Sequence, residues 1–162
     1  MEVVFTNKID GLDLEKLMDI YEESNLENLS MVKPDNEDIS DKNILYQKVR
    51  TSYKSYIKNE FLKDGKNHLA ILKDEKTYLA ALRIYDEGDF YFLEALETRP
   101  GSRRRGYGES LLREVFSLLK KGSEIRSEVS LSNKKSLDLH KKLGFTIIEK
   151  RKSNLLLTYK ID

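Results

Sequence analysis

A glycine-rich turn between an apolar run and an amphipathic run is the feature that most constrains this chain. The apolar run covers residues 90–98, the amphipathic run begins near residue 107, and the turn between them reads PGSRRRGYG over residues 100–108. A helix that begins after such a turn exposes unpaired amide groups and the positive end of its dipole. Glycines there let a ligand approach the backbone closely, and arginines add forked hydrogen-bond donors. The segment therefore predicts a site for a diphosphate group.

Two better-known phosphate motifs do not fit this turn. Gly101 and Gly106 have the spacing of a Walker A motif, but a tyrosine and a glycine follow where that motif needs a lysine and a serine or threonine. A dinucleotide-binding fingerprint needs a third glycine at the position of Leu111. The pattern that remains is Arg103-x-x-Gly106-x-Gly108.

A second motif reads NKKSLDLHKKLGF over residues 133–145. Asn133 is a favourable residue to cap the start of a helix, and Leu139 and Leu143 are four residues apart on one helical face. Gly144 is suited to the left-handed conformation that commonly ends a helix. The motif therefore predicts a helix over about 134–143 that leads into a strand.

Hydrophobic periodicity predicts the other elements. Apolar residues with helical spacing predict helices over 14–21, 45–57 and 111–119, and the polar stretch from about 28 to 43 is expected to be a loop. Short apolar runs predict strands over 2–6, 69–72, 78–82, 90–98 and 124–130, with a final hairpin over 145–160. We expect an α/β (α+β) fold, with a mixed, mostly antiparallel twisted sheet flanked by about four helices, as one domain over residues 1–162.

Both motifs resemble those of the GNAT superfamily of N-acetyltransferases. The pattern Arg-x-x-Gly-x-Gly/Ala resembles the signature that holds the pyrophosphate of coenzyme A in this family. The second motif resembles the family's C-terminal block, Asn-x-x-(Ala/Ser)-x-x-(Leu/Phe)-Tyr-x-x-x-Gly-Phe, and it follows the first in the family's order. The resemblance is close over residues 93–150. It implies acetyl-CoA as the cosubstrate and an amine as the acetyl acceptor.

The resemblance also implies which residues contact acetyl-CoA. The turn would bind the diphosphate through backbone amides and the Arg103 side chain. The edge of the strand at Leu96 and Thr98 would pair with the pantetheine arm. The residues assigned to the cofactor are Leu96, Thr98, Arg103, Arg104, Arg105, Gly106, Tyr107, Gly108, Asn133 and Ser136.

The reaction that the resemblance implies needs a base and an acid. An alkyl amine has a pKa near about 10, so it must lose a proton before it attacks the thioester. We expect Glu94 to be the base, because strand alternation places it on the face of Leu96 and Thr98, with Glu97 on the opposite face. Alternatively, Glu94 forms an ion pair with an arginine such as Arg83, and water removes the proton.

His140 stands where the family usually has a tyrosine, and we expect it to protonate the departing thiolate. The alternative is an ordinary histidine on a helix surface, with Asn133 or water assisting the thiolate. The tyrosines of the second helix, Tyr46, Tyr53 and Tyr56, fit packing better than an acceptor pocket. The acceptor, a small molecule or a peptide, is expected to contact residues 12–62, where the resemblance is weakest.

Composition narrows the remaining classes of function. With 29 basic and 28 acidic residues the net charge is +1, which argues against nucleic-acid or membrane partners. No cysteine and two histidines argue against a metal site. No apolar run approaches the roughly 18–20 residues needed to span a bilayer, and the N-terminus has no signal-peptide pattern, so a cytoplasmic protein is expected. Relatives commonly form homodimers. A non-catalytic CoA-binding domain remains the main alternative, and an RNA-associated protein a weaker one.

Overall fold

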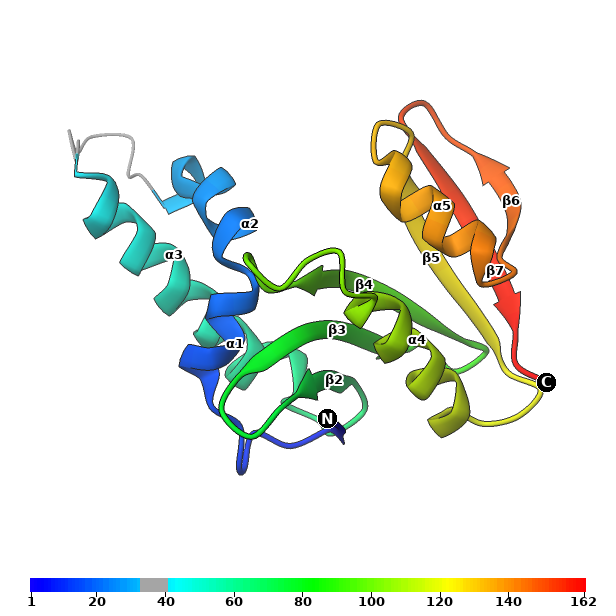
Figure 1. Ribbon diagram of the computed structural model, residues 1–162, viewed down its shortest axis with the longest axis horizontal. Coiled ribbons are helices and arrows are strands. Elements are labelled where there is room, and N and C mark those ends of the chain that lie inside the picture. The colour runs from blue at the N-terminus through cyan, green and yellow to red at the C-terminus, as the bar shows by residue number, and fades with distance from the viewer. Residues whose placement is uncertain (33–40) are drawn as a thin grey trace.

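The computed structural model describes residues 1–32 and 41–162, and one seven-stranded sheet runs through these residues in the order β1-β2-β3-β4-β5-β7-β6 (Figure 1). The strands β4 and β5 are parallel, and the other neighbours are antiparallel. The mixed, mostly antiparallel sheet is therefore confirmed. The strands are β1 (Glu2–Thr6), β2 (His68–Lys73), β3 (Tyr78–Asp86), β4 (Phe90–Thr98), β5 (Glu124–Ser130), β6 (Thr146–Lys150) and β7 (Asn154–Lys160).

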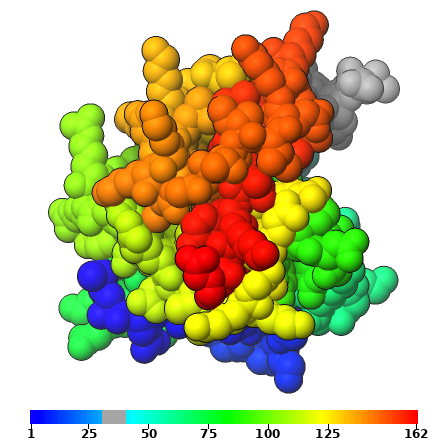
Figure 2. Space-filling model, turned by 90° about the vertical axis from the view of Figure 1, so that its right-hand side faces the viewer, coloured from blue at the N-terminus to red at the C-terminus, as the bar shows by residue number. Residues whose placement is uncertain are grey.

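Five α-helices flank this sheet within the described residues. They are α1 (Leu14–Ile20), α2 (Glu22–Glu27), α3 (Lys42–Tyr56), α4 (Tyr107–Leu118) and α5 (Lys134–Lys142), with a 3-10 helix at Leu29–Val32 and a π-helical turn at Ile57–Phe61 that continues α3. None of these helices is long and apolar enough to cross a membrane. Figure 2 shows the side of the molecule that the C-terminal segments cover, with β6 and β7 in orange to red.

The predicted order of elements is confirmed, with one additional helix. The chain bends at Tyr21, which ends α1 and precedes α2. The periodicity did not reveal α2 because this six-residue helix buries one residue, the polar Asn25. The expected loop over 28–43 is helical at Leu29–Val32 and from Lys42 onward, and its central part, 33–40, lies outside the described residues.

Strand alternation divides the core between the two faces of the sheet. On β2, Leu69 and Ile71 pack with the helices α1 and α3, whereas Ala70 and Leu72 pack with α4 on the other face. The same division continues through β3. Each face of the sheet is therefore covered by helices close to the glycine-rich turn, which lies between β4 and α4 (Figure 1).

A bulge in β4 reverses the alternation on which the assignment of Glu94 depended. Arg83 of β3 pairs with Glu94, but Ala81 pairs with Glu97, so β4 has one extra residue between these pairs. Ala95 lies at this extra position and has a positive φ of 55°. Glu94 and Glu97 therefore share the α1–α3 face, while the side chain of Leu96 packs on the α4 face. The expectation that Glu94 shares a face with Leu96 and Thr98 is wrong.

The strands β4 and β5 pair over only part of their lengths. Phe90–Leu93 pairs with Glu124–Ser127, and beyond Leu93 the strand β4 keeps β3 as its neighbour while β5 continues with β7 (Figure 1). The second half of β4 therefore has a backbone edge without a strand partner on the β5 side. The bulge lies in this half.

Candidate active site

The start of α4 presents backbone donors that the helix itself does not use. Gly106 is the N-cap, with a φ of 77° and no capping side chain. The first helical bond runs from the amide of Ser110 to the carbonyl of Gly106, at 2.9 Å. The amides of Tyr107, Gly108 and Glu109 therefore have no acceptor within the helix. These amides, with the helix dipole, form a site that suits a phosphate oxygen.

The backbone shape of the turn also fits a diphosphate. Arg104 and Gly106 both have left-handed φ values, of 62° and 77°, and such turns direct successive amides toward one side. A Cβ atom on Gly106 would meet nothing within 4 Å. On Gly108 it would lie 3.6 Å from Oγ1 of Thr98 and 3.9 Å from Cδ2 of Leu96, so α4 begins in close contact with β4. The predicted cofactor residues of β4 and of the turn are therefore neighbours.

The three arginines of the turn point to different surroundings. Arg103 forms an ion pair with Glu23 of α2, with 2.6 Å between Nη1 and Oε2, and its Nε donates to the carbonyl of Thr98 at 3.4 Å. Arg104 and Arg105 are exposed. Arg103 therefore links the turn to α2, and the other two arginines lie at the surface of the turn.

The unpaired edge of β4 includes Leu96 and Thr98, the two residues expected to pair with the pantetheine arm. An extended ligand can add to such an edge through main-chain hydrogen bonds. The position of the edge, next to the first turn of α4, agrees with a ligand whose diphosphate lies at the turn. That these residues bind the cofactor stays a prediction.

A pocket of about 370 Å³ lies on the other face of β4, between α2, α3, β3 and β4. Its aromatic wall is formed by Tyr21, Tyr53 and Tyr56, and its charged side chains are Arg83 and Glu97. Packing was the favoured interpretation of two of these tyrosines, but they also line a cavity. The sequence analysis missed Tyr21 and Glu97, because α2 and the bulge, which place them there, have no clear sequence signal.

Tyr21 connects this pocket to the bulge. Its ring is buried, and its hydroxyl donates to the carbonyl of Ala95 at 2.9 Å. Burial raises the pKa of Tyr21 well above its usual value, so the hydroxyl remains a donor. Burial also raises the pKa of Tyr53 to about 12. Tyr21 and Tyr53 are therefore neutral at physiological pH, and Tyr21 holds the bulge through its hydrogen bond to the carbonyl of Ala95.

Glu97 is the acidic residue of the pocket. Burial raises its pKa above the usual value, and the nearby charges of Glu27 and Glu23 raise it further. A hydrogen bond with Ser24 and the charge of Arg103 act in the opposite direction. A half-buried carboxyl group with a raised pKa in a cavity is a typical candidate for proton transfer or for binding a cation.

Glu94 lies outside the residues that line the pocket. Its carboxylate is 3.2 Å from Nη2 of Arg83, and its side chain is 47% exposed. The guanidinium of Arg83 also lies over the rings of Tyr53 and Tyr56, with its Cζ 5.5 and 5.3 Å from their centroids. The ion pair named above as the alternative for Glu94 is therefore present, and its role as the base stays a prediction.

His140 is buried, with 4% of its surface exposed. Its Nδ1 is 2.7 Å from the carbonyl of Ser136 on α5, and its Nε2 is 2.9 Å from the hydroxyl of Ser127 on β5. Because a carbonyl can only accept, Nδ1 carries the proton of the neutral ring and Nε2 accepts from Ser127. His140 thus joins α5 to β5.

The predicted N-cap of α5 is confirmed, since Oδ1 of Asn133 accepts from the amide of Ser136 at 3.1 Å.

The surroundings of His140 predict a pH-dependent contribution to stability. Burial lowers the pKa of His140 below 6.5, with the carbonyl of Ser136 acting weakly in the opposite direction. The unfolded chain therefore binds the proton more readily, so stability is lost as the pH falls below about 6.5 toward the lower folded-state pKa. We expect His140→Gln to be less stable than the wild type at pH 8 and this difference to shrink at pH 5.5, measured by thermal melting. A difference independent of pH would contradict the prediction. His68 is common to both proteins and cancels in the comparison.

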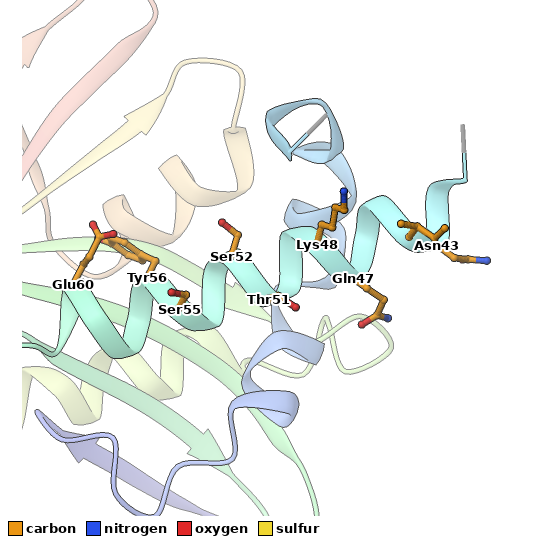
Figure 3. Close-up of a pocket in the computed structure, with 9 residues that line it drawn as sticks. Asn43, Gln47, Lys48, Thr51, Ser52, Ser55, Tyr56 and Glu60 are labelled. Atoms are coloured by element: carbon orange, nitrogen blue, oxygen red, sulfur yellow. The ribbon is translucent and has the colours of Figure 1, made fainter. Parts of the chain in front are cut away.

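A larger hollow, of about 980 Å³, follows the exposed side of α3. Its lining residues all come from α3 and the π-helical turn, and Figure 3 shows their side chains along this single helix, with none of them forming an opposite wall. It is an open surface rather than an enclosed site. Among residues 1–32 and 41–162, no three His, Cys, Asp or Glu side chains are grouped as a metal site requires.

Known structures share this fold over nearly the whole chain. The PaiA N-acetyltransferase of Thermoplasma acidophilum, solved with coenzyme A, is 17% identical, with a TM-score of 0.67 and 99% of each chain covered. The ribosomal-protein-S18-alanine N-acetyltransferase of Escherichia coli is 16% identical, with a TM-score of 0.65 over 99% of this chain and 95% of that one. The N-acetyltransferase PseH of Campylobacter jejuni, solved with acetyl-CoA, is 13% identical, with a TM-score of 0.61 and 99% of each chain covered.

The arrangement of sheet, turn and helices thus defines an acetyltransferase fold. The sequence profile of the Acetyltransferase (GNAT) family matches residues 14–145, and the chain belongs to this family. A search of curated proteins found no match.

Proposed function

We propose that this protein is an N-acetyltransferase that moves the acetyl group of acetyl-CoA to a primary amine by direct attack on the thioester. The observation that carries the proposal is the arrangement around β4. The unpaired edge of this strand leads to the glycine-rich turn at one end, and the bulge at Ala95 directs Glu97 into the pocket on the other face. A cofactor along the edge and an amine in the pocket would therefore meet at the bulge.

The proposed reaction balances as follows. The bound ammonium loses a proton to a base, and the free amine nitrogen attacks the carbonyl carbon of the thioester. The new C–N bond forms as the C–S bond breaks, the nitrogen loses a second proton, and the thiolate of coenzyme A takes up one proton. The products are an N-acetylated amine, coenzyme A and one released proton. Holding both reactants in position supplies much of the rate, and proton transfer adds about 10²–10⁴-fold.

Two carboxylates of β4 are candidates for the base. Glu94 is the candidate from the sequence, but it forms an ion pair with Arg83 and lies outside the pocket. Glu97 lines the pocket and has a raised pKa, which makes it the better proton acceptor near neutral pH. The dependence of kcat on pH, measured for Glu94→Gln and for Glu97→Gln, discriminates between these two candidates. For the acid, His140 is the candidate from the sequence, but its ring is buried and its one proton lies on Nδ1 against the carbonyl of Ser136, which favours the alternative of water or Asn133.

The first test is ligand-dependent melting. A ligand present at about 100 times its Kd adds roughly 2.7 kcal/mol, or about 5–10 °C for a domain of this size. We expect such a shift with acetyl-CoA and with coenzyme A, and none with ATP or NAD. Coenzyme A release with a panel of amines then tests turnover. Binding without turnover of any amine would indicate the non-catalytic alternative, and an equal shift with ATP would contradict the proposal.

A further inference from the structure

Arg103 connects the glycine-rich turn to the helix α2. It is the first residue of the phosphate-binding motif, and its side chain forms an ion pair with Glu23 of α2 at 2.6 Å. Side-chain exposures of 47% and 50% mean that a ligand can reach this pair and exchange one partner. In Figure 1, α2 lies beside the turn that follows β4. A diphosphate at the turn would compete with Glu23 for Arg103, because the diphosphate of coenzyme A carries two negative charges and the carboxylate one, and arginine binds phosphates with paired hydrogen bonds.

Acidic residues lie close to the pocket next to this ion pair. Glu97 lines it, and the charges of Glu23 and Glu27 are close enough to raise the pKa of Glu97. Arg103 is the cation whose charge acts against them. The other cation of the pocket is Arg83, and its charge is balanced by Glu94.

The walls of the pocket suit an alkyl amine. The rings of Tyr53 and Tyr56, which also contact the guanidinium of Arg83, line it together with Glu97, so an alkyl chain would meet apolar surface and an ammonium would meet a carboxylate. Polar side chains at α2 complete the wall nearest Glu23, so α2 contributes to the pocket as well as to the ion pair with Arg103. A ligand with one positive charge at Glu97 could therefore place a second near the acidic residues of α2.

We propose that the acceptor is an alkyl amine with a second positive charge, and that cofactor binding strengthens its affinity by drawing Arg103 away from Glu23. Glu97 binds the reacting ammonium, and the released Glu23 binds the distal one. This inference rests on the proposed function, since it needs coenzyme A at the turn. It adds the class of acceptor and a role for Glu23 in binding it.

The experiment measures binding rather than turnover. Coenzyme A is titrated first into the full chain at low ionic strength, by calorimetry. Linear diamines of increasing length and the matched monoamines are then titrated with and without saturating coenzyme A. The variants are Glu23→Gln, Glu97→Gln and, as a matched control in the same turn of α2, Glu22→Gln.

For the wild type and for Glu22→Gln, coenzyme A should tighten diamine binding about two- to fivefold and leave monoamine binding nearly unchanged, as expected for one exposed charge pair. Glu23→Gln should lose this effect. It should also bind coenzyme A about two- to fivefold more tightly without amine, because no ion pair then competes for Arg103. Glu97→Gln should weaken both classes of amine by tenfold or more, because a hydrogen bond to a charged group is lost.

The outcomes separate the two proposals. If coenzyme A does not bind, the proposed function and this inference both fail. If coenzyme A binds but its effect is equal for diamines and monoamines, or unchanged in Glu23→Gln, the inference alone is overturned. Absence of diamine binding to the complex with coenzyme A would overturn the class of acceptor.

Discussion

Replacing Gly106 with valine is expected to weaken acetyl-CoA binding by at least about tenfold. Gly106 has a φ of 77°, and a residue with a Cβ pays about 1–3 kcal/mol to adopt such a conformation. Valine, which is branched at Cβ, is especially unfavourable there. The turn would relax toward negative φ, and the amides of Tyr107 and Gly108 would no longer point to one ligand. A loss of 1.4 kcal/mol in binding corresponds to a factor of ten, measured by calorimetry.

Gly88 provides the matched control for this variant. It lies in the β3–β4 turn with a φ of 87°, and a Cβ there, as at Gly106, would meet nothing within 4 Å. Gly88→Val should therefore lower the melting temperature about as much as Gly106→Val, by a few degrees at about 2–4 °C per kcal/mol. It should leave acetyl-CoA affinity unchanged. Equal loss of affinity in both variants would mean that the Gly106 turn is not the cofactor site.

The second large effect is expected at the bulge, where Ala95→Val should reduce turnover by about 100-fold or more. Ala95 has a φ of 55°, and a β-branched residue is a genuine outlier in this region. If the bulge is lost, the strand slips by one residue and exchanges its faces, so Glu97 leaves the pocket. Misplacement of a reacting group by about 1 Å can already reduce the rate 100-fold. Release of coenzyme A with a substrate amine measures the effect.

Ala95→Gly is the control for the bulge. Glycine adopts positive φ readily, so this variant should keep the bulge, the pocket and most of the turnover. The strain of valine, about 1–3 kcal/mol, should lower the melting temperature of Ala95→Val by roughly 2–12 °C relative to Ala95→Gly. Full activity in the valine variant would show that the reaction does not depend on the bulge.

Local patterns in the sequence predicted most of the fold because they report on neighbours along the chain. The helix N-cap at Asn133 needs only the amide of Ser136, three residues away, and it was predicted correctly. The turn at Gly106 needs only its own backbone and the first residues of α4. Along the apolar runs of β2 and β3, successive side chains alternate between the face covered by α1 and the face covered by α4. These features follow from backbone geometry and side-chain period, so the order of elements could be read in advance.

Only the tertiary structure decided which residues line the pocket. The register between β3 and β4 creates the bulge, which places Glu97 beside α2 and leaves Glu94 with Arg83. Likewise, the packing of α5 on β5 buries His140, which one interpretation of the sequence placed at the surface. Each of these outcomes depends on contacts between residues distant in the chain. A one-residue bulge leaves the hydrophobic pattern almost unchanged, yet it exchanges the faces of every residue that follows in the strand.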